Sequence, residues 1–510
     1  MVAATENDLS IGIVGAGAMG RGIAQVAAGG GMAVRLYDAV EGAAEAGREF
    51  VAGMLARQVE KGRLEVADAA AANARIEVVS GLDDLAGCQA VVEAVVEDLA
   101  VKHQVFQALE AVLDDNAVIA SNTSSIRIAS IAAACAQPRR IAGMHFFNPV
   151  PLMRLVEVIR APQTGDDVAD LLCDIGRRMG RTPVVVKDGP GFLVNLGGRA
   201  FYTEALRILH EGVATPAQVD AVMRDCCNYR MGPFELMDLT GIDVNFPVSQ
   251  IVFEGFFNDR RLATSPPHQA LFEAGRYGRK SGAGYYDYGA DGKALAGISP
   301  DATSTAAPAP AVALLGDDPE GALAELLAAS GTEIRPDDGQ IPLLCAPLGE
   351  DASAFAARTG ADHRRLLAVD TSVPADKRLT LMAPPGADPE LAAAVVARLA
   401  TSDAKVTFIK DSPGFIAQRI RAMVANLGCE MAQIGIASPA DIDTAMTLGL
   451  NYPQGPLALA DAMGPNTVLR ILSRLQELSG DDRYRPSTWL RRRASYCQKL
   501  VMRISGGAFD

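Results

Sequence analysis

The sequence predicts an α/β protein in which a mostly parallel sheet precedes a helical domain, with both parts recurring later in a decayed second copy. Short apolar runs alternate with helical segments over roughly the first 187 residues, and amphipathic helices dominate from there to about residue 288. A distinctive segment that begins at Lys187 then recurs at Lys410. Strands that alternate with helices indicate a parallel sheet covered on both faces.

The strand-like runs are short and apolar, as buried parallel strands are. A glycine-rich turn and a small helix-compatible segment separate the first two runs. Helical segments lie between the others. The expected strands are Leu9–Val14, Ala33–Tyr37, Ala90–Val96, Ala117–Ala120, Ile141–Phe147 and Leu155–Ile159.

The helical block contains one clear start signal and is followed by an irregular stretch. At Thr215–Gln218 the threonine can cap a helix, Pro216 fits its first turn, and Gln218 can reach back to the cap. Residues 291–310 are rich in Ala, Pro, Ser, Thr and Gly, which is typical of an interdomain linker.

A repeat with one constant offset shows that the helical domain is duplicated. The matches share an offset of 223 residues: Lys187–Phe192 with Lys410–Phe415, Thr215-Pro216 with Ser438-Pro439, and Asn228-Tyr229 and Gly232-Pro233 with Asn451-Tyr452 and Gly455-Pro456. One offset maintained over more than 40 residues indicates a common structural unit.

The repeat is expected to extend upstream in poorer register. Ala311–Gly316 resembles the first strand, but Asp317, Asp318 and Pro319 follow where glycines would be needed. Leu366–Ser372 is interpreted as the counterpart of Val118–Ser124, and Met382-Ala383 as that of Met144-His145. Residues 311–407 are therefore expected to form a degenerate copy that has lost its ligand chemistry.

Composition narrows the class of partner and the compartment. The formal net charge is −14, which disfavours nucleic acid and anionic membranes as general partners. No apolar run reaches the roughly 18 residues of a membrane span, and the N-terminus does not look like a signal peptide. The eight cysteines include no C-x-x-C pair. We expect a soluble cytoplasmic protein with reduced thiols.

The glycine-rich turn is a dinucleotide-binding motif in its proper context. Gly15-Ala16-Gly17-Ala18-Met19-Gly20 follows a strand and opens a helix, whose free N–H groups suit a pyrophosphate. Asp38 ends the next strand, where a carboxylate binds ribose hydroxyls and repels a 2′-phosphate. The pattern predicts a Rossmann-type fold that binds NAD rather than NADP.

Further motifs make the chain resemble the 3-hydroxyacyl-CoA dehydrogenase family. The resemblance runs from about residue 10 to 288. It rests on Ser121–Ser125 (SNTSS), His145–Pro151 (HFFNPVP), Leu155–Glu157, Lys187–Asn195 (KDGPGFLVN), Met231–Glu235 and Gly278–Gly282.

The resemblance implies a role for individual residues. His145 would be the catalytic base and Glu157 its partner, and Ser124 and Asn195 would hold the reacting oxygen. Besides the glycine motif and Asp38, the expected NAD contacts are Glu97, Lys102, Asn122, Ser124, Asn148 and Lys280. Lys61 would contact a phosphate of coenzyme A, while Ser124 and Asn195 would also contact the substrate.

These residue types suit the oxidation of a secondary alcohol. Imidazole can take a hydroxyl proton near neutral pH, and a carboxylate on its other nitrogen fixes the tautomer. Hydroxyl and amide donors can stabilise charge that develops on oxygen. The other histidines (His103, His210, His268 and His363) show no metal-ligand spacing, and no metal site is expected.

Within the family, the chain resembles long bacterial forms with an incomplete second half, in particular those that oxidise 3-hydroxyadipyl-CoA in phenylacetate breakdown. Gly241–Phe246, Val252-Phe253 and Arg260-Arg261 carry that likeness. A dicarboxylic acyl chain would need a cation near its far end, for which Arg199, Arg230 and Arg260 are candidates by charge alone.

The same residues are also compatible with other functions. The substrate could be 3-hydroxybutyryl-CoA of fatty-acid or butanoate metabolism, or a hydroxy acid without coenzyme A. A non-catalytic protein with a relic nucleotide fold is a third reading, which suits residues 311–407 better than residues 1–290. The protein could form a homodimer. Within each chain, the two helical domains are expected to pair with each other.

Five segments are expected. They are an NAD-binding Rossmann domain (1–187), a helical substrate and dimerisation domain (188–290), a linker (291–310), a degenerate Rossmann-like domain (311–407) and a second helical domain (408–510). The second copy is expected to bind no NAD, since Ala383 stands where His145 is expected and Gln418 where Asn195 sits.

Overall fold

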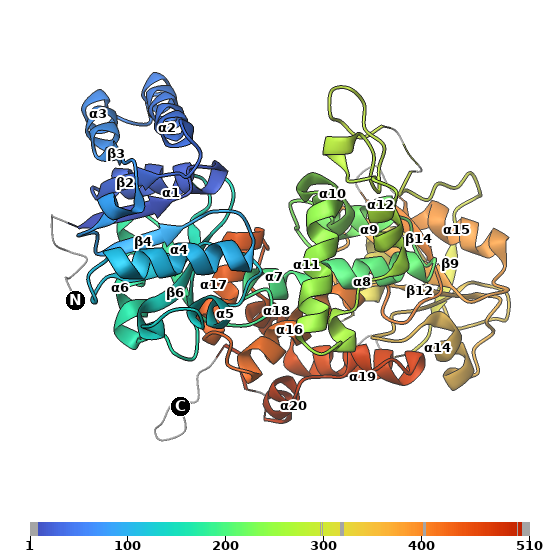
Figure 1. Cartoon of the computed structure of the whole chain (residues 1–510). Coiled ribbons are helices and arrows are strands. Elements are labelled where there is room, and N and C mark those ends of the chain that lie inside the picture. Colours follow the sequence, from blue (N-terminus) through green and yellow to red (C-terminus); the bar gives the residue numbers. More distant parts are fainter. Residues whose placement is uncertain are drawn as a thin grey trace. The chain divides into compact units, whose positions relative to one another are not determined.

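The computed structural model describes residues 9–295, 297, 299–316, 321–400, 404–496 and 498–501. These residues fall into two compact units. The first comprises the chain up to Leu196 together with Ile434–Leu450, and the second comprises Gly197–Gln433 together with the chain from Asn451 onward. Each unit contains one sheet (Figure 1). The predicted Asp317, Asp318 and Pro319 lie outside the described residues.

The sheet of the first unit has eight described strands in the order β3-β2-β1-β4-β5-β6-β7-β8. All neighbours pair in parallel except β6 and β7, which are antiparallel. The sequence interpretation missed β3 and β8. The strands are β1 (Ser10–Val14), β2 (Ala33–Tyr37), β3 (Ile76–Val78), β4 (Ala90–Glu93), β5 (Val118–Ser121), β6 (Ile141–Phe146), β7 (Leu155–Arg160) and β8 (Thr182–Lys187).

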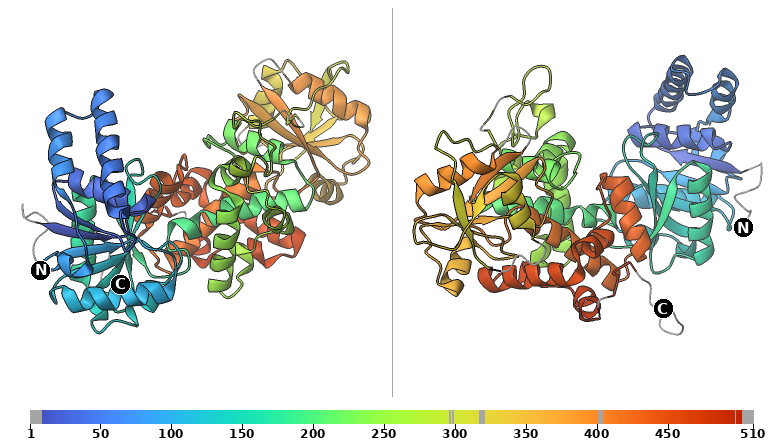
Figure 2. Two further views of the ribbon diagram at one scale, coloured as in Figure 1. Left: turned by 45° about the horizontal axis from the view of Figure 1, so that its top comes forward. Right: turned by 180° about the vertical axis from the view of Figure 1, so that it is seen from behind.

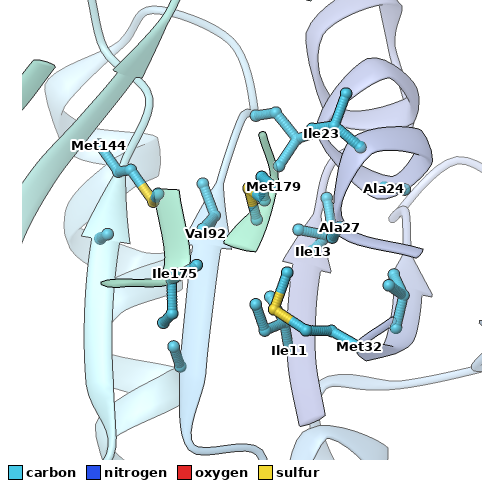
Figure 3. Packing of buried hydrophobic residues seen from close by; sticks show 14 of the residues in the cluster. Ile11, Ile13, Ile23, Ala24, Ala27, Met32, Val92, Met144, Ile175 and Met179 are labelled. Atoms are coloured by element: carbon cyan, nitrogen blue, oxygen red, sulfur yellow. The ribbon is translucent and has the colours of Figure 1, made fainter. Parts of the chain in front are cut away.

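Helices connect most of these strands, and α2 with α3 forms an arm beside the β2–β3 edge (Figures 1 and 2). Apolar side chains of α1 and α6 pack with those of the central strands in one core, which includes Ile23 and Ala27 of α1 and Ile11 and Ile13 of β1 (Figure 3). The helices are α1 (Ala18–Gly29), α2 (Ala43–Glu60), α3 (Val66–Ala74), α4 (Leu99–Val112), α5 (Ile128–Ala132), α6 (Asp166–Arg178) and α7 (Val194–Gly197).

The second unit contains two sets of helices, one for each copy of the helical domain. The predicted helix start at Thr215 is present, because Thr215 Oγ1 accepts from the Gln218 N–H and Gln218 Oε1 accepts from the Thr215 N–H. The first set is α8 (Arg199–His210), α9 (Pro216–Asp225), α10 (Pro233–Thr240), α11 (Ile242–Gly255) and α12 (Pro266–Glu273). The second is α16 (Ala417–Gln433), α17 (Pro439–Leu450, in the first unit), α18 (Pro456–Met463), α19 (Pro465–Ser479) and α20 (Thr488–Ser495).

The sheet of the second unit has six described strands in the order β10-β9-β11-β12-β13-β14 (yellow to orange in Figure 2). Its strands are β9 (Ala311–Leu314), β10 (Glu333–Ile334), β11 (Leu343–Cys345), β12 (Leu366–Val369), β13 (Arg378–Ala383) and β14 (Lys405–Lys410), and its helices are α13 (Ala322–Ala329), α14 (Ala352–Thr359) and α15 (Pro389–Leu399). Residues of the predicted linker pack on this sheet, where Ala302 N donates to Val406 O and Asp301 pairs with Arg378.

The second sheet repeats the first with fewer elements. β13 is antiparallel to β12 and parallel to β14, as β7 is to β6 and β8. Asp411 accepts hydrogen bonds from the first N–H groups of α14, just as Asp188 does from those of α5. This places α14 and β12 at the positions of α5 and β6, and β11 at that of β5. The elements between β2 and β5 have no described counterpart.

This topology corrects two residue equivalences predicted from the sequence. Met382-Ala383 lies on β13 and matches Ile159-Arg160 of β7, not Met144-His145. Leu366–Val369 forms β12, at the position of β6, and so does not correspond to Val118–Ser121 of β5. The interpretation slipped because it assumed that every strand of the first copy had a counterpart. The expected order of a Rossmann-type fold, a helical domain and a degenerate second copy of each is present.

Each copy places one helix on the sheet of the other copy. In the first unit, α17 packs on β7 and β8, and Lys187 N donates to Ile436 O. In the second unit, α9 packs on β13, and Lys410 N donates to Val213 O. These two hydrogen bonds are equivalent under the 223-residue offset. The exchange is therefore reciprocal.

The two helical domains pair within the second unit. Tyr229 contacts its own repeat equivalent, Tyr452, with ring centroids 5.3 Å apart. Such a contact is expected where two copies face each other around a two-fold axis. Beside it, the buried Arg419 of α16 bonds Glu204 of α8 at 2.7 Å and the Tyr484 hydroxyl at 2.8 Å.

Arg419→Ala should destabilise the protein strongly, because it leaves the carboxylate of Glu204 buried with less compensation. We expect a loss of about 3–5 kcal/mol in the free energy of unfolding. The exposed Arg177, paired with Asp174, is the control, and Arg177→Ala should cost about 1 kcal/mol or less. Urea unfolding followed by circular dichroism measures both. Equal stability of the two variants would show that the buried ion pair does not hold the helical domains together.

Candidate active site

The glycine turn has the geometry needed to receive a dinucleotide. Gly15 has φ of +100°, and a Cβ there would lie 2.6 Å from Ala94 O. A Cβ on Gly20 would lie 1.7 Å from Gly15 O, so strand and helix pack too closely for any side chain. A Cβ on the exposed Gly17 would meet nothing within 4 Å. Gly17 therefore leaves open space beside the uncapped N-terminus of α1, which suits a pyrophosphate.

Two neighbours complete this turn. Ala18 is exposed and Met19 half-buried at the start of α1. Asp38, at the end of β2, accepts hydrogen bonds from the Ala16 N–H at 2.7 Å and the Val40 N–H at 2.9 Å. The carboxylate is thus fixed against the glycine turn, and it adds negative charge where a 2′-phosphate would have to lie. The residues fit NAD.

Glu97 organises a second group of residues at the carboxyl edge, the edge of the sheet where the parallel strands have their carboxyl ends. Its Oε1 accepts from the Thr123 and Ser125 hydroxyls and from the Ser124 N–H. Burial acts to raise the pKa of Glu97, but these hydrogen bonds and the Lys102 ammonium outweigh it and hold the pKa below its ordinary value. The ionised carboxylate therefore fixes the loop that carries Ser124.

Lys102 lies behind this loop. The side chain is 1% exposed, and its ammonium lies 2.7 Å from Glu93 and 3.5 Å from Glu97. Ser121 also donates to Glu93, so a buried polar network supports the loop from below. A contact between Lys102 and a cofactor would have to replace these partners. In this structure Lys102 supports the loop through its ion pair with Glu97.

The antiparallel pairing of β6 with β7 sets His145 directly opposite Glu157. Nδ1 of the imidazole lies 2.6 Å from Glu157 Oε2, and both side chains are buried. The rings of Phe147 and Phe192 lie 4.5 and 5.9 Å from the imidazole ring. Nε2 has no hydrogen-bond partner among the described residues and is not fully enclosed. The pair thus presents one oriented nitrogen that can exchange a proton.

The second oxygen of Glu157 is held by the backbone. Its Oε1 accepts from the N–H groups of Leu193 at 3.0 Å and Val194 at 2.9 Å. Gly191 and Phe192, which precede these donors, both have positive φ, and for Phe192 this backbone conformation is strained. The turn directs two N–H groups at a buried carboxylate. Both carboxylate oxygens of Glu157 therefore have hydrogen-bond partners, although no lysine or arginine pairs with it among the described residues.

Ser124 and Asn195 lie together in the same unit. Asn195 Nδ2 donates to Ser124 O at 3.4 Å, and the side chain of Ser124 is exposed. Asn122 Oδ1 accepts from the Phe146 N–H at 2.8 Å, which ties the end of β5 to the end of β6 beside His145. Asn148 is exposed just beyond β6. Glu97, Asn122, Ser124 and Asn148 thus follow the carboxyl ends of β4, β5 and β6.

The two predicted lysine contacts lie on different elements. Lys61 is exposed where α2 ends, on the arm of the first unit. Lys280 belongs to the second unit, in the short turn η4 (Arg279–Ser281), where its ammonium pairs with Asp243 at 2.6 Å. The arginine candidates also differ. Arg199 is buried and donates to Ser249, Arg260 pairs with Asp481, and Arg230 is exposed.

Sequence reasoning missed several supporting residues. Glu93 and Ser121 belong to the network below Glu97, and Asp188 anchors the N-terminus of α5. A signal existed for Asp188, because its segment recurs with Asp411 in the same position. The donors of Leu193 and Val194 are backbone groups, which leave no trace in residue type.

A dinucleotide cradle beside a His–carboxylate pair defines an NAD-linked dehydrogenase of hydroxyl groups. Comparison with known proteins agrees. The NAD-binding domain of 3-hydroxyacyl-CoA dehydrogenase matches residues 10–189, and the C-terminal domain matches residues 191–288 and again 414–499. The chain belongs to the 3-hydroxyacyl-CoA dehydrogenase family. The double match agrees with the duplicated helical domain.

Individual relatives match at full length or over the first copy. The 3-hydroxyadipyl-CoA dehydrogenase of Escherichia coli K12 is 38% identical over 96% of this chain and 98% of its own length. A crystal structure of a 3-hydroxybutyryl-CoA dehydrogenase from the same strain covers 96% of this chain and 99% of its own, with a TM-score of 0.85 and 35% identity. A probable 3-hydroxybutyryl-CoA dehydrogenase of Deinococcus radiodurans is 39% identical, over 55% of this chain and its whole length.

The second copy lacks the equivalent chemistry among its described residues. Register places Thr380 at the position of Glu157 and Asp370 opposite it, where His145 would be. Gln418, at the position of Asn195, is buried and bonded to Gly349 N, Pro347 O and Asp370. The counterpart of His145 is thus Asp370, not Ala383.

Binding measurements should give one NAD per chain. Titration of the whole protein with NADH, followed by calorimetry, counts the sites. Gly20→Val should abolish binding, because the side chain would collide with the Gly15 carbonyl. Gly29→Val is the control, because a Cβ at this exposed end of α1 would meet nothing within 4 Å. A second site that survives Gly20→Val would contradict the loss of nucleotide binding in residues 311–407.

Glu157→Gln should impair turnover while leaving the fold intact. The amide can still accept from the N–H groups of Leu193 and Val194, but it no longer bears a charge beside the imidazole. We expect kcat to fall roughly 10²-fold or more, with the affinity for NADH unchanged. Glu77→Gln, at an exposed carboxylate on β3, is the matched control. Normal kcat in Glu157→Gln would remove the carboxylate from the mechanism.

Proposed function

We propose that this 3-hydroxyacyl-CoA dehydrogenase oxidises a (3S)-3-hydroxyacyl-CoA to the 3-oxoacyl-CoA with His145 as the general base. The main support is the His145–Glu157 pair, whose free Nε2 belongs to the unit that holds Ser124 and Asn195. Bound NAD would supply the hydride acceptor. The protein must orient the alcohol, take its proton and tolerate the charge that results.

A side chain of the first unit is available for each of these tasks. Nε2 of His145 takes the hydroxyl proton, and the resulting imidazolium is stabilised by the Glu157 carboxylate at Nδ1. Ser124 and Asn195 donate to the reacting oxygen, which orients the alcohol and stabilises negative charge on it. In the reverse direction the same imidazolium returns the proton to the oxygen.

The cofactor contacts follow the carboxyl edge of the sheet. Gly15, Gly17, Ala18, Met19 and Gly20 would surround the pyrophosphate, while Asp38 would bind the adenosine ribose. Glu97, Asn122, Ser124 and Asn148 would lie along the nicotinamide half, with Lys102 supporting Glu97. Lys280 is a weaker candidate because Asp243 already neutralises its charge. Lys61 would bind a phosphate of coenzyme A from the arm of α2.

For the substrate, we propose 3-hydroxyadipyl-CoA in the catabolism of phenylacetate. The full-length match to the Escherichia coli enzyme of that name supports this. The solved structure that covers the chain equally well bears the name of a 3-hydroxybutyryl-CoA dehydrogenase, so the shorter substrate is the alternative. Of the three candidate arginines, only Arg230 has no hydrogen bond or ion pair to another described side chain. By charge alone, Arg230 is therefore the candidate to test for binding the distal carboxylate.

His145→Gln tests the mechanism. The amide preserves size and polarity but cannot take a proton, so kcat should fall by roughly 10²–10⁴, while NADH binding remains. His363→Gln, which changes an exposed histidine of the second copy, should behave like the unmodified protein. Near-normal turnover by the His145 variant would mean that another group is the base.

A panel of 3-hydroxyacyl-CoA thioesters tests the substrate. The value of kcat/KM should be higher for 3-hydroxyadipyl-CoA than for 3-hydroxybutyryl-CoA, and Arg230→Ala should lower it roughly tenfold for the dicarboxylic substrate alone. Arg260→Ala is the control, since that guanidinium already pairs with Asp481. Equal or better use of 3-hydroxybutyryl-CoA would exclude the adipyl assignment.

A further inference from the structure

The second copy retains a large cleft in the second unit. Its volume is about 1030 Å³. The loops after three strands form one wall: Leu315-Gly316 after β9, Ala346–Leu348 after β11, and Thr371-Ser372 after β12. The opposite wall comes from α16, α18 and α19 of the second helical domain. Since ligands of open parallel sheets bind beyond the carboxyl ends of the strands, the cleft lies where this architecture places a ligand.

The groups lining this cleft are not those of an oxidoreductase. β9 ends at Leu314, and Gly316 is the only glycine among the described residues of the turn that directly follows it. Gln418, the counterpart of Asn195, is committed to buried hydrogen bonds behind the wall. The cleft therefore lies at the carboxyl ends of the strands but lacks the side chains that would carry out the reaction.

Arginines line the cleft instead. Four guanidinium groups are present (Arg358, Arg421, Arg470 and Arg474) against one carboxylate, Glu350. They come from three elements, α14, α16 and α19, that are far apart in sequence. This is a local excess of positive charge in a chain whose formal net charge is −14.

The single carboxylate does not neutralise all four. Glu350 is bonded by Arg358 at 3.0 Å and by Arg474 at 2.7 Å. Burial acts to raise the pKa of Glu350, but these two guanidinium groups outweigh it and lower the pKa, so the carboxylate is ionised at neutral pH. Glu350 thus holds two arginines in fixed orientations at the wall.

The other two arginines, Arg421 and Arg470, form no ion pair with a carboxylate of the described residues. Arg421 donates to the carbonyl of Ser372 at 3.0 Å, which fixes its direction without neutralising it. Arg470 is exposed. Neither guanidinium has a carboxylate within 4 Å among the residues that the structure describes. Planar guanidinium groups match the paired oxygens of phosphate and carboxylate.

We propose that this cleft binds a small organic polyanion that bears phosphate or carboxylate groups, and that it binds it without reaction. The volume suits a small molecule rather than a single ion. A multivalent anion satisfies Arg421 and Arg470 together. The site would therefore give the inactive half a ligand of its own, independent of the dehydrogenase reaction in the first half.

Calorimetric titration of the full chain tests this without using turnover. NADH is present at saturation to occupy the first nucleotide site, and the probes are inorganic pyrophosphate and citrate. The test variant is Arg421→Ala/Arg470→Ala. The control is Arg63→Ala/Arg492→Ala, which removes two exposed arginines outside the cleft. Thermal unfolding of each variant confirms that it is folded.

At least one probe should bind with one site per chain, and the test variant should weaken that binding at least tenfold while the control leaves it unchanged. Preference for pyrophosphate would identify a phosphate ligand, and preference for citrate a polycarboxylate. No saturable binding of either anion would overturn the proposal. So would binding that the cleft variant leaves intact, or that the control variant weakens as much.

Discussion

The antiparallel pairing of β6 with β7 is the constraint on which the active half depends. A parallel crossover would separate residues 145 and 157, whereas the antiparallel neighbours set an imidazole and a carboxylate 2.6 Å apart inside a buried sheet. The buried Glu157 carboxylate is tolerated there because two backbone N–H groups bind its other oxygen. Strand register, a strained turn at Phe192 and a free imidazole nitrogen are thus parts of one arrangement.

The sequence predicted most of the fold because local signals were strong. The glycine turn, the buried apolar strands and the capping box at Thr215 each have a short-range physical cause. It missed β3, which is only three residues long, and β8, whose alternating burial differs from the continuous runs of the other strands. It also misplaced the strands of the second copy. The 223-residue offset still holds for β13, but the elements between β2 and β5 have no described counterpart, so matching the strands by their order along the chain fails.

Motifs in the sequence name the side chains of the candidate site, but they do not name the backbone groups that support those side chains. His145, Glu157, Ser124 and Asn195 could be named from their motifs, and the structure places them in one unit. The support below them could not be named, because Glu93 lies inside the predicted apolar strand Ala90–Val96 and the donors of Leu193 and Val194 are backbone groups with no residue signature. Lys102 is predicted from the family resemblance as an NAD contact, but its burial between two carboxylates depends on packing that no local pattern records.

Reciprocal packing of α9 and α17 limits how the two halves can evolve. Each sheet has one flank covered by a helix encoded in the opposite half of the chain, so neither half can discard its helical domain without uncovering its neighbour. Active-site residues of the later half are under no such restraint. Selection could therefore erase a redox centre while conserving the scaffold around it, and leave an empty binding cleft free to acquire a different ligand.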